Sequence, residues 1–231
     1  MSSAGPLAPP PRGKTEYVYD WLKQRILSGE IEPGAMLRQS ELAKQLGVSY
    51  TPVREALRQL QATGLLQHTA DRGSAVTELA PQAIEELYAL RGAIEGLAAR
   101  LAASRRTEED LATLTRSLTA AETDLAAAAP AEVLARHSRE FHAAVARIGG
   151  PEVIAPRLEQ LWSAYPIPRT ASVWQNRDLA AELVAEHRAL LGLLTAGDAA
   201  GAAELMAGHI QRAARLRRSE AADADEIDDS R

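Results

Sequence analysis

Three histidines in the C-terminal half are the residues of this 231-residue chain best suited to hold a metal ion. His142, His187 and His209 lie in three separate helical patterns, each beside apolar residues. Imidazole nitrogens bind Zn²⁺ and similar divalent ions, and three of them leave a coordination position open for a further ligand. The spacing alone is equally compatible with three unconnected histidines in the core or at the surface, because sequence does not show convergence.

A single arginine interrupts an otherwise apolar stripe. Arg91 lies between Leu90 and Ile94 in a long helical pattern. An arginine in such a place is rarely buried without a partner. Two roles follow from that rule. Arg91 either forms an internal salt bridge, for example with Glu95, or binds the carboxylate of a small effector molecule.

A second group of polar residues suits contact with DNA. Several of them open a short helix expected over 50–63, whose free N–H groups favour phosphate. A helix that enters the major groove by its N-terminus presents such residues to phosphates and base edges. The tip of a following hairpin carries an arginine for the minor groove and a glycine that permits close approach. The predicted DNA contacts are Arg38, Ser49, Tyr50, Thr51, Arg54, Arg58, Arg72 and Gly73.

Charge and composition narrow the class of protein. The net charge is −5, but residues 219–231 alone carry −5, while residues 14–79 hold eight basic and eight acidic side chains. The acidic total therefore does not argue against nucleic acid binding, which depends on local clustering. Cysteine is absent, which excludes disulfides, cysteine-based zinc sites and a thiol nucleophile. No apolar run is long enough for a membrane span or a signal peptide, so we expect a cytoplasmic protein.

The elements around the polar helix are short. Apolar spacing predicts helices at about 16–27, 41–46 and 50–63. Two strand-like runs at 65–68 and 75–79 then flank a turn, which indicates a hairpin. Three short helices followed by a hairpin make a winged helix-turn-helix, which we assign to residues 15–79.

Longer amphipathic helices follow, and the predicted fold class is mainly α. They are expected at about 81–104, 107–127, 131–148, 151–165, 174–196 and 199–218. Together they predict an all-α six-helix bundle domain over residues 80–218. A proline-rich leader over residues 1–14 and an acidic tail over residues 219–231 are expected to be disordered.

The N-terminal module resembles the GntR family of bacterial transcription regulators. The resemblance covers about 65 residues and includes the runs Leu27-Ser28-Gly29, Glu41-Leu42-Ala43, Leu46-Gly47-Val48-Ser49 and Thr51-Pro52-Val53-Arg54-Glu55-Ala56-Leu57. It implies that Arg54, the Ser and Thr residues at the start of that helix, and the hairpin tip contact operator DNA. The chain departs from the family at Tyr50, where an arginine is common. An arginine there would make bidentate contacts to guanine, which tyrosine does not.

The helical module resembles the FCD ligand-binding domain of the FadR branch of that family. The matching residues include Leu87-Tyr88-Ala89-Leu90-Arg91, Phe141-His142, Glu186-His187, Gly197-Asp198 and His209-Ile210. The resemblance implies a homodimer, a small carboxylate effector, and a divalent metal such as Zn, Ni or Mn held by three histidines and one Asp or Asn. Ser138 stands at the Asp or Asn position. We therefore assign His142, His187 and His209 to the metal, and Arg91 and Ser138 to the effector.

Taken together, these features predict a DNA-binding transcription regulator and not an enzyme. We expect a repressor that binds a pseudo-palindromic operator as a dimer and responds to a small organic acid. One alternative is a metal-dependent hydrolase that uses the three histidines, although no His-Glu-x-x-His motif supplies a base. Another is a non-specific architectural DNA binder, which has no need of a long helical domain.

Overall fold

The structure is a computed structural model that describes residues 13–27, 29–69, 73–164 and 172–228. Most of the expected leader, residues 1–12, and the predicted DNA contact Arg72 lie outside these ranges. The chain divides into two compact units at the boundary between Glu78 and Leu79.

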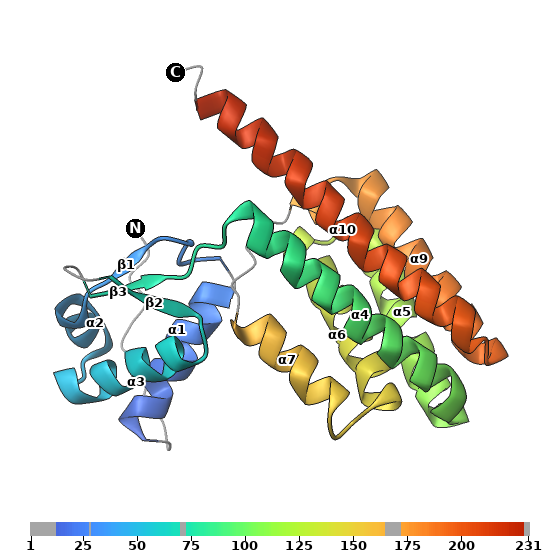
Figure 1. Cartoon of the computed structure of the whole chain (residues 1–231), viewed down its shortest axis with the longest axis horizontal. Helices are drawn as coiled ribbons and strands as arrows, with labels where there is room; N and C mark the ends of the chain where they lie inside the picture. The colour runs from blue at the N-terminus through green and yellow to red at the C-terminus, as the bar shows by residue number, and fades with distance from the viewer. Residues whose placement is uncertain (1–12, 28, 70–72, 165–171, 229–231) are drawn as a thin grey trace. The chain divides into compact units, whose positions relative to one another are not determined.

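The first unit is a three-helix fold with a small sheet (Figure 1). Its elements in order are α1 Lys14–Leu27, β1 Met36–Leu37, α2 Gln39–Leu46, α3 Tyr50–Ala62, β2 Leu66–Thr69 and β3 Gly73–Val76. The sheet order is β1-β3-β2 and both pairs are antiparallel, with Gln67 opposite Ala75 in the hairpin. The hairpin and the three helices predicted from sequence are present, but the second strand, expected over 75–79, is β3 at Gly73–Val76, and α1 begins at Lys14, inside the leader expected over 1–14. Strand β1 was not predicted, because two residues are too few to show an alternating pattern.

Apolar stripes on the helices of this unit explain its core. Residues spaced three and four apart bring one face of α1 against α3, and the buried side chains are Val18, Leu22 and Ile26 on α1 and Val53, Ala56, Leu57 and Leu60 on α3. Helix α2 ends at Gly47, whose φ of 64° favours glycine. The chain then reaches α3 within three residues, which gives the tight turn of a helix-turn-helix.

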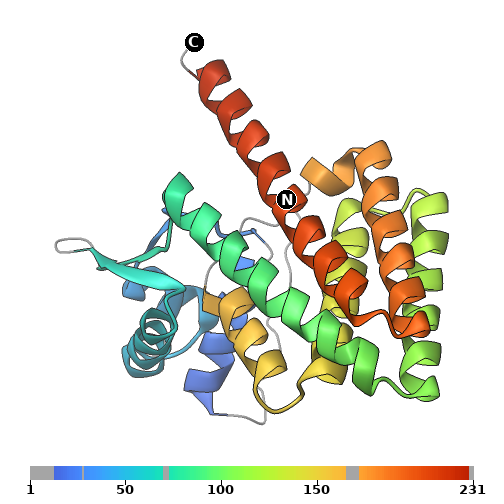
Figure 2. The ribbon, with the colours of Figure 1, turned by 45° about the vertical axis from the view of Figure 1, so that its right-hand side comes forward.

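The second unit is all helical (Figures 1 and 2). Its helices are α4 Pro81–Arg105, α5 Glu108–Ala126, α6 Ala131–Gly149, α7 Ile154–Ala164, α8 Ser172–Gln175, α9 Arg177–Ala196 and α10 Ala199–Asp228. A capping box between Thr107 and Asp110 starts α5. None of the described helices is both long enough and apolar enough to cross a membrane.

Two predicted boundaries in this unit were wrong. A single helix over 174–196 was expected, but α8 ends at Gln175 and α9 begins at Arg177, because the Asn176 side chain caps α9 by accepting from the N–H groups of Asp178 and Leu179. The acidic tail was expected to be disordered from residue 219, but α10 continues to Asp228. That segment contains no Gly or Pro and is rich in Ala, which favours helix. Residues 229–231 lie outside the described ranges.

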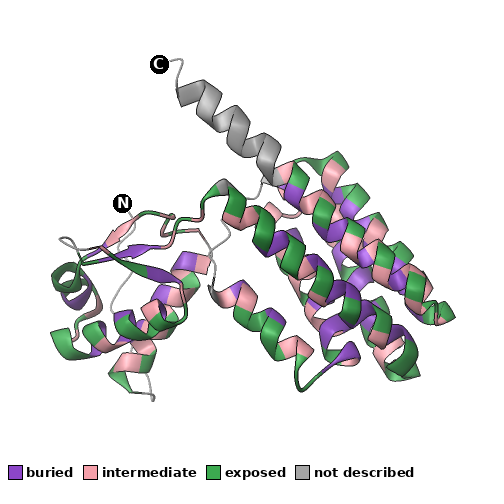
Figure 3. Cartoon of the chain, viewed as in Figure 1, coloured by how far each residue is buried: buried purple, intermediate pink, exposed green. Residues whose placement is uncertain are grey.

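Small residues let the helices of the second unit approach closely. A Cβ added at Gly96 of α4 would lie 3.1 Å from the carbonyl oxygen of Ala203 on α10, and one at Gly149 of α6 would overlap the backbone of Ala98 on α4. Buried residues, purple in Figure 3, lie on the sides of these helices that face one another. The close packing fixes α4, α6 and α10 relative to one another inside this unit, and these helices carry much of the candidate site.

Candidate functional site

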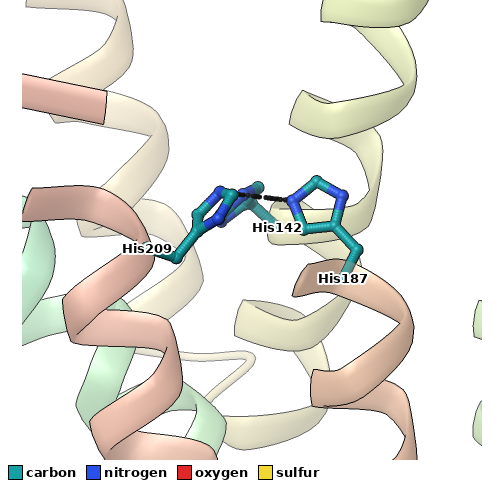
Figure 4. A group of neighbouring side chains, drawn as sticks. All are labelled: His142, His187 and His209. Atoms are coloured by element: carbon teal, nitrogen blue, oxygen red, sulfur yellow. Dashed lines mark hydrogen bonds between the residues drawn. The ribbon is translucent and has the colours of Figure 1, made fainter. Parts of the chain in front are cut away.

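The three predicted metal ligands meet in the core of the helical unit (Figure 4). His142 on α6, His187 on α9 and His209 on α10 are all buried. The Nε2 atom of His187 lies 3.1 Å from Nε2 of His142 and 3.3 Å from Nε2 of His209. Each histidine offers one ligand atom, and the three atoms lie within 4.8 Å of one another. The structure thus brings together side chains that are 45 and 22 residues apart in the chain.

The spacing of these nitrogens suits a divalent ion. Nitrogen ligands about 2.0–2.1 Å from a tetrahedral zinc ion lie roughly 3.3–3.4 Å from each other. The two Nε2 separations of 3.1 and 3.3 Å are close to that value. Three neutral imidazoles also form a donor set that Zn²⁺, Ni²⁺ and related ions accept. The residues present therefore fit a metal ion held by His142, His187 and His209.

Two carboxylates that the sequence did not assign to this site contact the opposite nitrogens of two of the rings. Glu95 Oε2 on α4 lies 2.6 Å from Nδ1 of His142, and Glu186 Oε2 on α9 lies 2.6 Å from Nδ1 of His209. Glu95 was considered only as a partner for Arg91. The signal in the sequence was the place of Glu95 between Ile94 and Gly96 on a long helical pattern, because a carboxylate that becomes buried there needs a partner.

The carboxylates are themselves held by arginines. Arg91 Nε donates to Glu95 Oε1 at 2.9 Å, so the internal salt bridge considered for Arg91 is present. Burial alone would raise the pKa of Glu95, but the charge of Arg91 and the contact with His142 outweigh it and lower the pKa to about 2. Arg212 donates to Glu186 at 2.6 Å and also pairs with Glu182. Glu95, only 1% exposed, is therefore ionised and fully paired.

Ser138 lies one helical turn before His142 and is half-buried. No hydrogen bond joins its side chain to another described residue. Its neighbours point elsewhere: His137 Nε2 contacts Asp124 on α5 at 2.7 Å, and Arg139 donates to Glu159 on α7 at 2.9 Å. Neither neighbour replaces the carboxylate that Ser138 lacks.

Burial favours the neutral rings of His142 and His187. It lowers the pKa of His142, although Glu95 acts in the opposite direction. The pKa of His187 lies well below its ordinary value, because burial disfavours the charged ring and the charges of His142 and His209 act in the same direction. Neutral rings are the form that binds a metal.

The lowered pKa values predict a pH-dependent stability for the metal-free protein. An unfolded histidine has a pKa of about 6.5, so below that pH the unfolded chain binds protons that folded His142 and His187 do not. Stability is therefore present above about pH 6.5 and is lost as the pH falls. Between pH 7.5 and 5.5 we expect a loss of roughly 1 kcal/mol per buried histidine, measured as a lower denaturant midpoint with a chelator present. In His187→Gln, the loss of stability between pH 7.5 and pH 5.5 should be smaller than in wild type. An equal or larger loss of stability in this variant would contradict the lowered pKa of His187.

The predicted DNA contacts that the structure describes are on the surface of the first unit. Ser49 precedes α3 and its side chain makes no capping hydrogen bond, and Tyr50 begins the helix with 61% of its surface exposed. The other exposed members are Arg38, Thr51, Arg54, Arg58 and Gly73. The first turn of α3 thus has both an unused hydroxyl and free N–H groups, which suits a phosphate.

Each described arginine in this set has a glutamate near it. Arg54 and Arg58 lie 3.6 and 3.8 Å from the carboxylate of Glu55, and Arg38 donates to Glu41 at 3.3 Å. Such exposed pairs contribute little to stability, so DNA phosphates compete for these arginines at small cost. The pairs also explain why this module carries no net positive charge although it presents several arginines.

Gly73 opens β3 opposite Thr69, beside the tip of the hairpin. Its φ of 99° lies in the region that favours glycine, while a Cβ would lie 3.7 Å from the Leu37 carbonyl oxygen, an ordinary contact. Backbone conformation therefore explains this glycine better than crowding does. Arg72, the predicted minor-groove contact, lies outside the described residues.

A winged helix-turn-helix joined to a helical unit with a buried histidine cluster is the architecture of a class of bacterial regulator. The chain matches the model of bacterial regulatory proteins of the gntR family over residues 14–76 and that of the FCD domain over residues 86–212. It belongs to the GntR family and carries an FCD domain, as the sequence resemblance indicated. The family and the relatives below are transcription regulators, so the hydrolase interpretation gains no support from them.

Several regulators resemble this chain over most of its length. It is 34% identical over 198 residues to the probable D-xylose utilization operon transcriptional repressor of Paenarthrobacter nicotinovorans, covering 84% of each chain. It is 31% identical over 186 residues to the Nta operon transcriptional regulator of Aminobacter aminovorans, covering 80% of this chain and 86% of that one. The solved structure of McbR/YncC from Escherichia coli superposes with a TM-score of 0.76 at 26% identity and covers 90% of this chain and 99% of that chain.

Proposed function

We propose that the protein is a ligand-responsive, cytoplasmic repressor of the FadR branch that binds a pseudo-palindromic operator as a homodimer. Residues 15–79 bind DNA, and residues 80–218 bind the effector and associate with a second chain. Two relatives support the repressor assignment by their names, the D-xylose utilization operon repressor and the repressor GlaR of Escherichia coli.

The buried histidine cluster is the observation that carries the effector part of this proposal. Three imidazoles with facing Nε2 atoms in a protein core serve no evident purpose in packing alone, since an apolar residue fills such space at lower cost. In a DNA-binding chain that is not an enzyme, the cluster is best explained as a sensory site. His142, His187 and His209 would hold Zn²⁺, Ni²⁺ or Mn²⁺.

A bound divalent ion would supply a Lewis-acid centre for a carboxylate oxygen of the effector. The protein residues around the ion would supply further polar groups for the effector. Ser138 supplies a hydroxyl one helical turn before His142, and Arg91 places a positive charge one helical turn from Glu95. Effector binding that favours one arrangement of the helical unit would change operator affinity through the segment around Leu79-Ala80-Pro81.

We place the dimer interface on the exposed face of α4. Leu90 and Leu97 lie two turns apart on this face and are 48% and 49% exposed. Glu86 and Arg100 flank them, are exposed, and have no ion-pair partner among the described residues. If two α4 helices cross antiparallel about a twofold axis near Ala93, Leu90 faces Leu97 of the partner subunit and Glu86 faces Arg100 of the partner subunit. The face is thus complementary to itself.

Charge reversal tests this interface. Glu86→Arg or Arg100→Glu alone should weaken the dimer on the order of tenfold, because two symmetric pairs worth about 0.5–1 kcal/mol each become repulsive. The double variant should recover the wild-type dimer. Sedimentation equilibrium measures the dissociation constants, and Arg116→Glu on α5 is the control. Single reversals that leave the dimer unchanged would place the interface elsewhere.

The function as a whole is tested by operator binding. Fluorescence anisotropy is measured with DNA from the region upstream of the gene, at fixed salt, with and without Zn²⁺ and a panel of small organic acids. Sequence-specific binding that an acid weakens supports a ligand-responsive repressor. Salt-sensitive binding without sequence preference would instead support the architectural DNA binder.

A further inference from the structure

We propose that Glu95 and Glu186 are positioning residues that set the tautomers of His142 and His209 and so prepare the cluster for a metal ion before one binds. This inference rests on the metal site proposed above and extends it to side chains that do not touch the ion. The assignment follows from two matched chains of contacts that lead away from the cluster on different sides.

The two chains have the same chemical order. In one, Arg91 Nε contacts Glu95 Oε1 at 2.9 Å and Glu95 Oε2 contacts His142 Nδ1 at 2.6 Å. In the other, Arg212 Nη1 contacts Glu186 Oε1 at 2.6 Å and Glu186 Oε2 contacts His209 Nδ1 at 2.6 Å. Each carboxylate uses one oxygen for an arginine and the other for a ring. Because both oxygens are engaged, neither carboxylate is free to turn away from its histidine.

These contacts fix which nitrogen carries the proton. An ionised carboxylate only accepts hydrogen bonds, so Nδ1 of His142 and of His209 must be the donor. In a neutral ring the other nitrogen, Nε2, then has the free lone pair. Both Nε2 atoms lie next to Nε2 of His187, at 3.1 and 3.3 Å. Two ligand lone pairs are thus directed to one region by groups outside it.

His187 is held differently. No carboxylate contacts its Nδ1 among the described residues, and its ring stacks on Phe141 with centroids 4.7 Å apart and planes inclined by 22°. Without a metal, the Nε2–H of His187 donates to the Nε2 lone pair of either His142 or His209, and so satisfies one of the two Nε2 contacts at a time. Only His187 then has to move its proton from Nε2 to Nδ1 when an ion binds. Two of the three histidines therefore already have the tautomer that binds a metal, and the third, His187, changes its tautomer on binding.

Neighbouring positions on α9 divide these tasks. Glu186 contacts His209 on α10, while His187, the next residue, faces His142 on α6. Successive helical residues point about 100° apart, so one turn of α9 supplies a ligand and also orients the ligand of another helix. The Glu-His pair thus has a specific reason to be adjacent.

The test is Zn²⁺ affinity of Glu95→Gln and Glu186→Gln, measured by competition with a chromophoric chelator. Each variant should bind Zn²⁺ about 10–100-fold more weakly, the usual loss when an outer partner of a ligating histidine is removed. Glutamine has a single acceptor oxygen, so it cannot serve both the arginine and the ring. Glu122→Gln is the matched control, because Glu122 also pairs with an arginine on another helix, Arg188, but does not contact the histidine cluster.

A second readout needs no metal. Nitrogen-15 NMR of the histidine rings in chelator-treated protein should show the Nδ1–H tautomer for His142 and His209, and loss of it at His142 in Glu95→Gln. Circular dichroism checks that the variants fold. Because Glu186 is more exposed than Glu95, Glu186→Gln should disturb folding less than Glu95→Gln. If wild-type protein binds no Zn²⁺, the proposed metal site fails. The NMR tautomers of His142 and His209 then still test whether Glu95 and Glu186 orient these rings. Unchanged tautomers, or Zn²⁺ affinities within twofold of wild type in both variants, would overturn the proposed positioning role.

Discussion

Replacing Arg54 with alanine is expected to weaken specific operator binding at least about 30-fold while the protein stays folded. Arg54 lies on the exposed side of α3, and its only ion pair among the described residues is with Glu55 at 3.6 Å, so its removal costs little stability. A specific arginine contact to DNA contributes about 1–3 kcal/mol. A dimer loses it twice, which corresponds to on the order of 30-fold to 10⁴-fold in affinity. Anisotropy titrations at a fixed salt concentration measure the loss.

Glu55→Gln is the matched control for this prediction. It removes the carboxylate that lies near both Arg54 and Arg58 and leaves both arginines in place. Because the competing negative charge disappears, we expect operator affinity equal to or higher than that of wild type. Wild-type affinity in Arg54→Ala, together with an unchanged salt dependence, would show that α3 does not read the operator through this residue.

Replacing His187 with alanine should remove the metal. Purified, untagged wild-type protein is expected to contain about one Zn, Ni or Mn per chain. Structural zinc sites with four ligands bind with about 10–16 kcal/mol, or roughly 3 kcal/mol per ligand, so one lost histidine weakens binding on the order of 100-fold. Elemental analysis after desalting, normalised to chain concentration, should then find almost no metal in His187→Ala.

Two further variants separate the cluster from its surroundings. His137 lies on the same helix as His142, but its ring contacts Asp124 and not the cluster. The metal content of His137→Ala should therefore equal that of wild type. Ser138→Asp restores the carboxylate of the family pattern and should tighten metal binding. If wild-type protein takes up no metal even after soaking in Zn²⁺, then Ser138 marks a lost site. Arg91 and the three histidines would in that case bind an organic acid directly.

Local sequence signals were sufficient for most of the helices and for the helix-turn-helix. Apolar spacing located α1, α3 and the long helices of the second unit, because a helix that packs on one side repeats every three to four residues. The signals were insufficient where an element is very short or where one residue divides two helices. Strand β1 depends on its pairing with the distant strand β3, whereas the break at Asn176 comes from a local cap that apolar spacing does not show.

The sequence by itself determined the class of this protein and singled out the three histidines that we propose as metal ligands. The motif from Leu46 to Leu57 is local, and His142, His187 and His209 are distinctive residue types at family positions. Only the tertiary structure decided that the three rings converge and that the carboxylates of Glu95 and Glu186 contact two of them. The reason is physical. Helix spacing fixes which face a residue occupies, but contacts between helices far apart in the chain depend on how closely those helices pack, and here glycines such as Gly96 and Gly149 permit that approach.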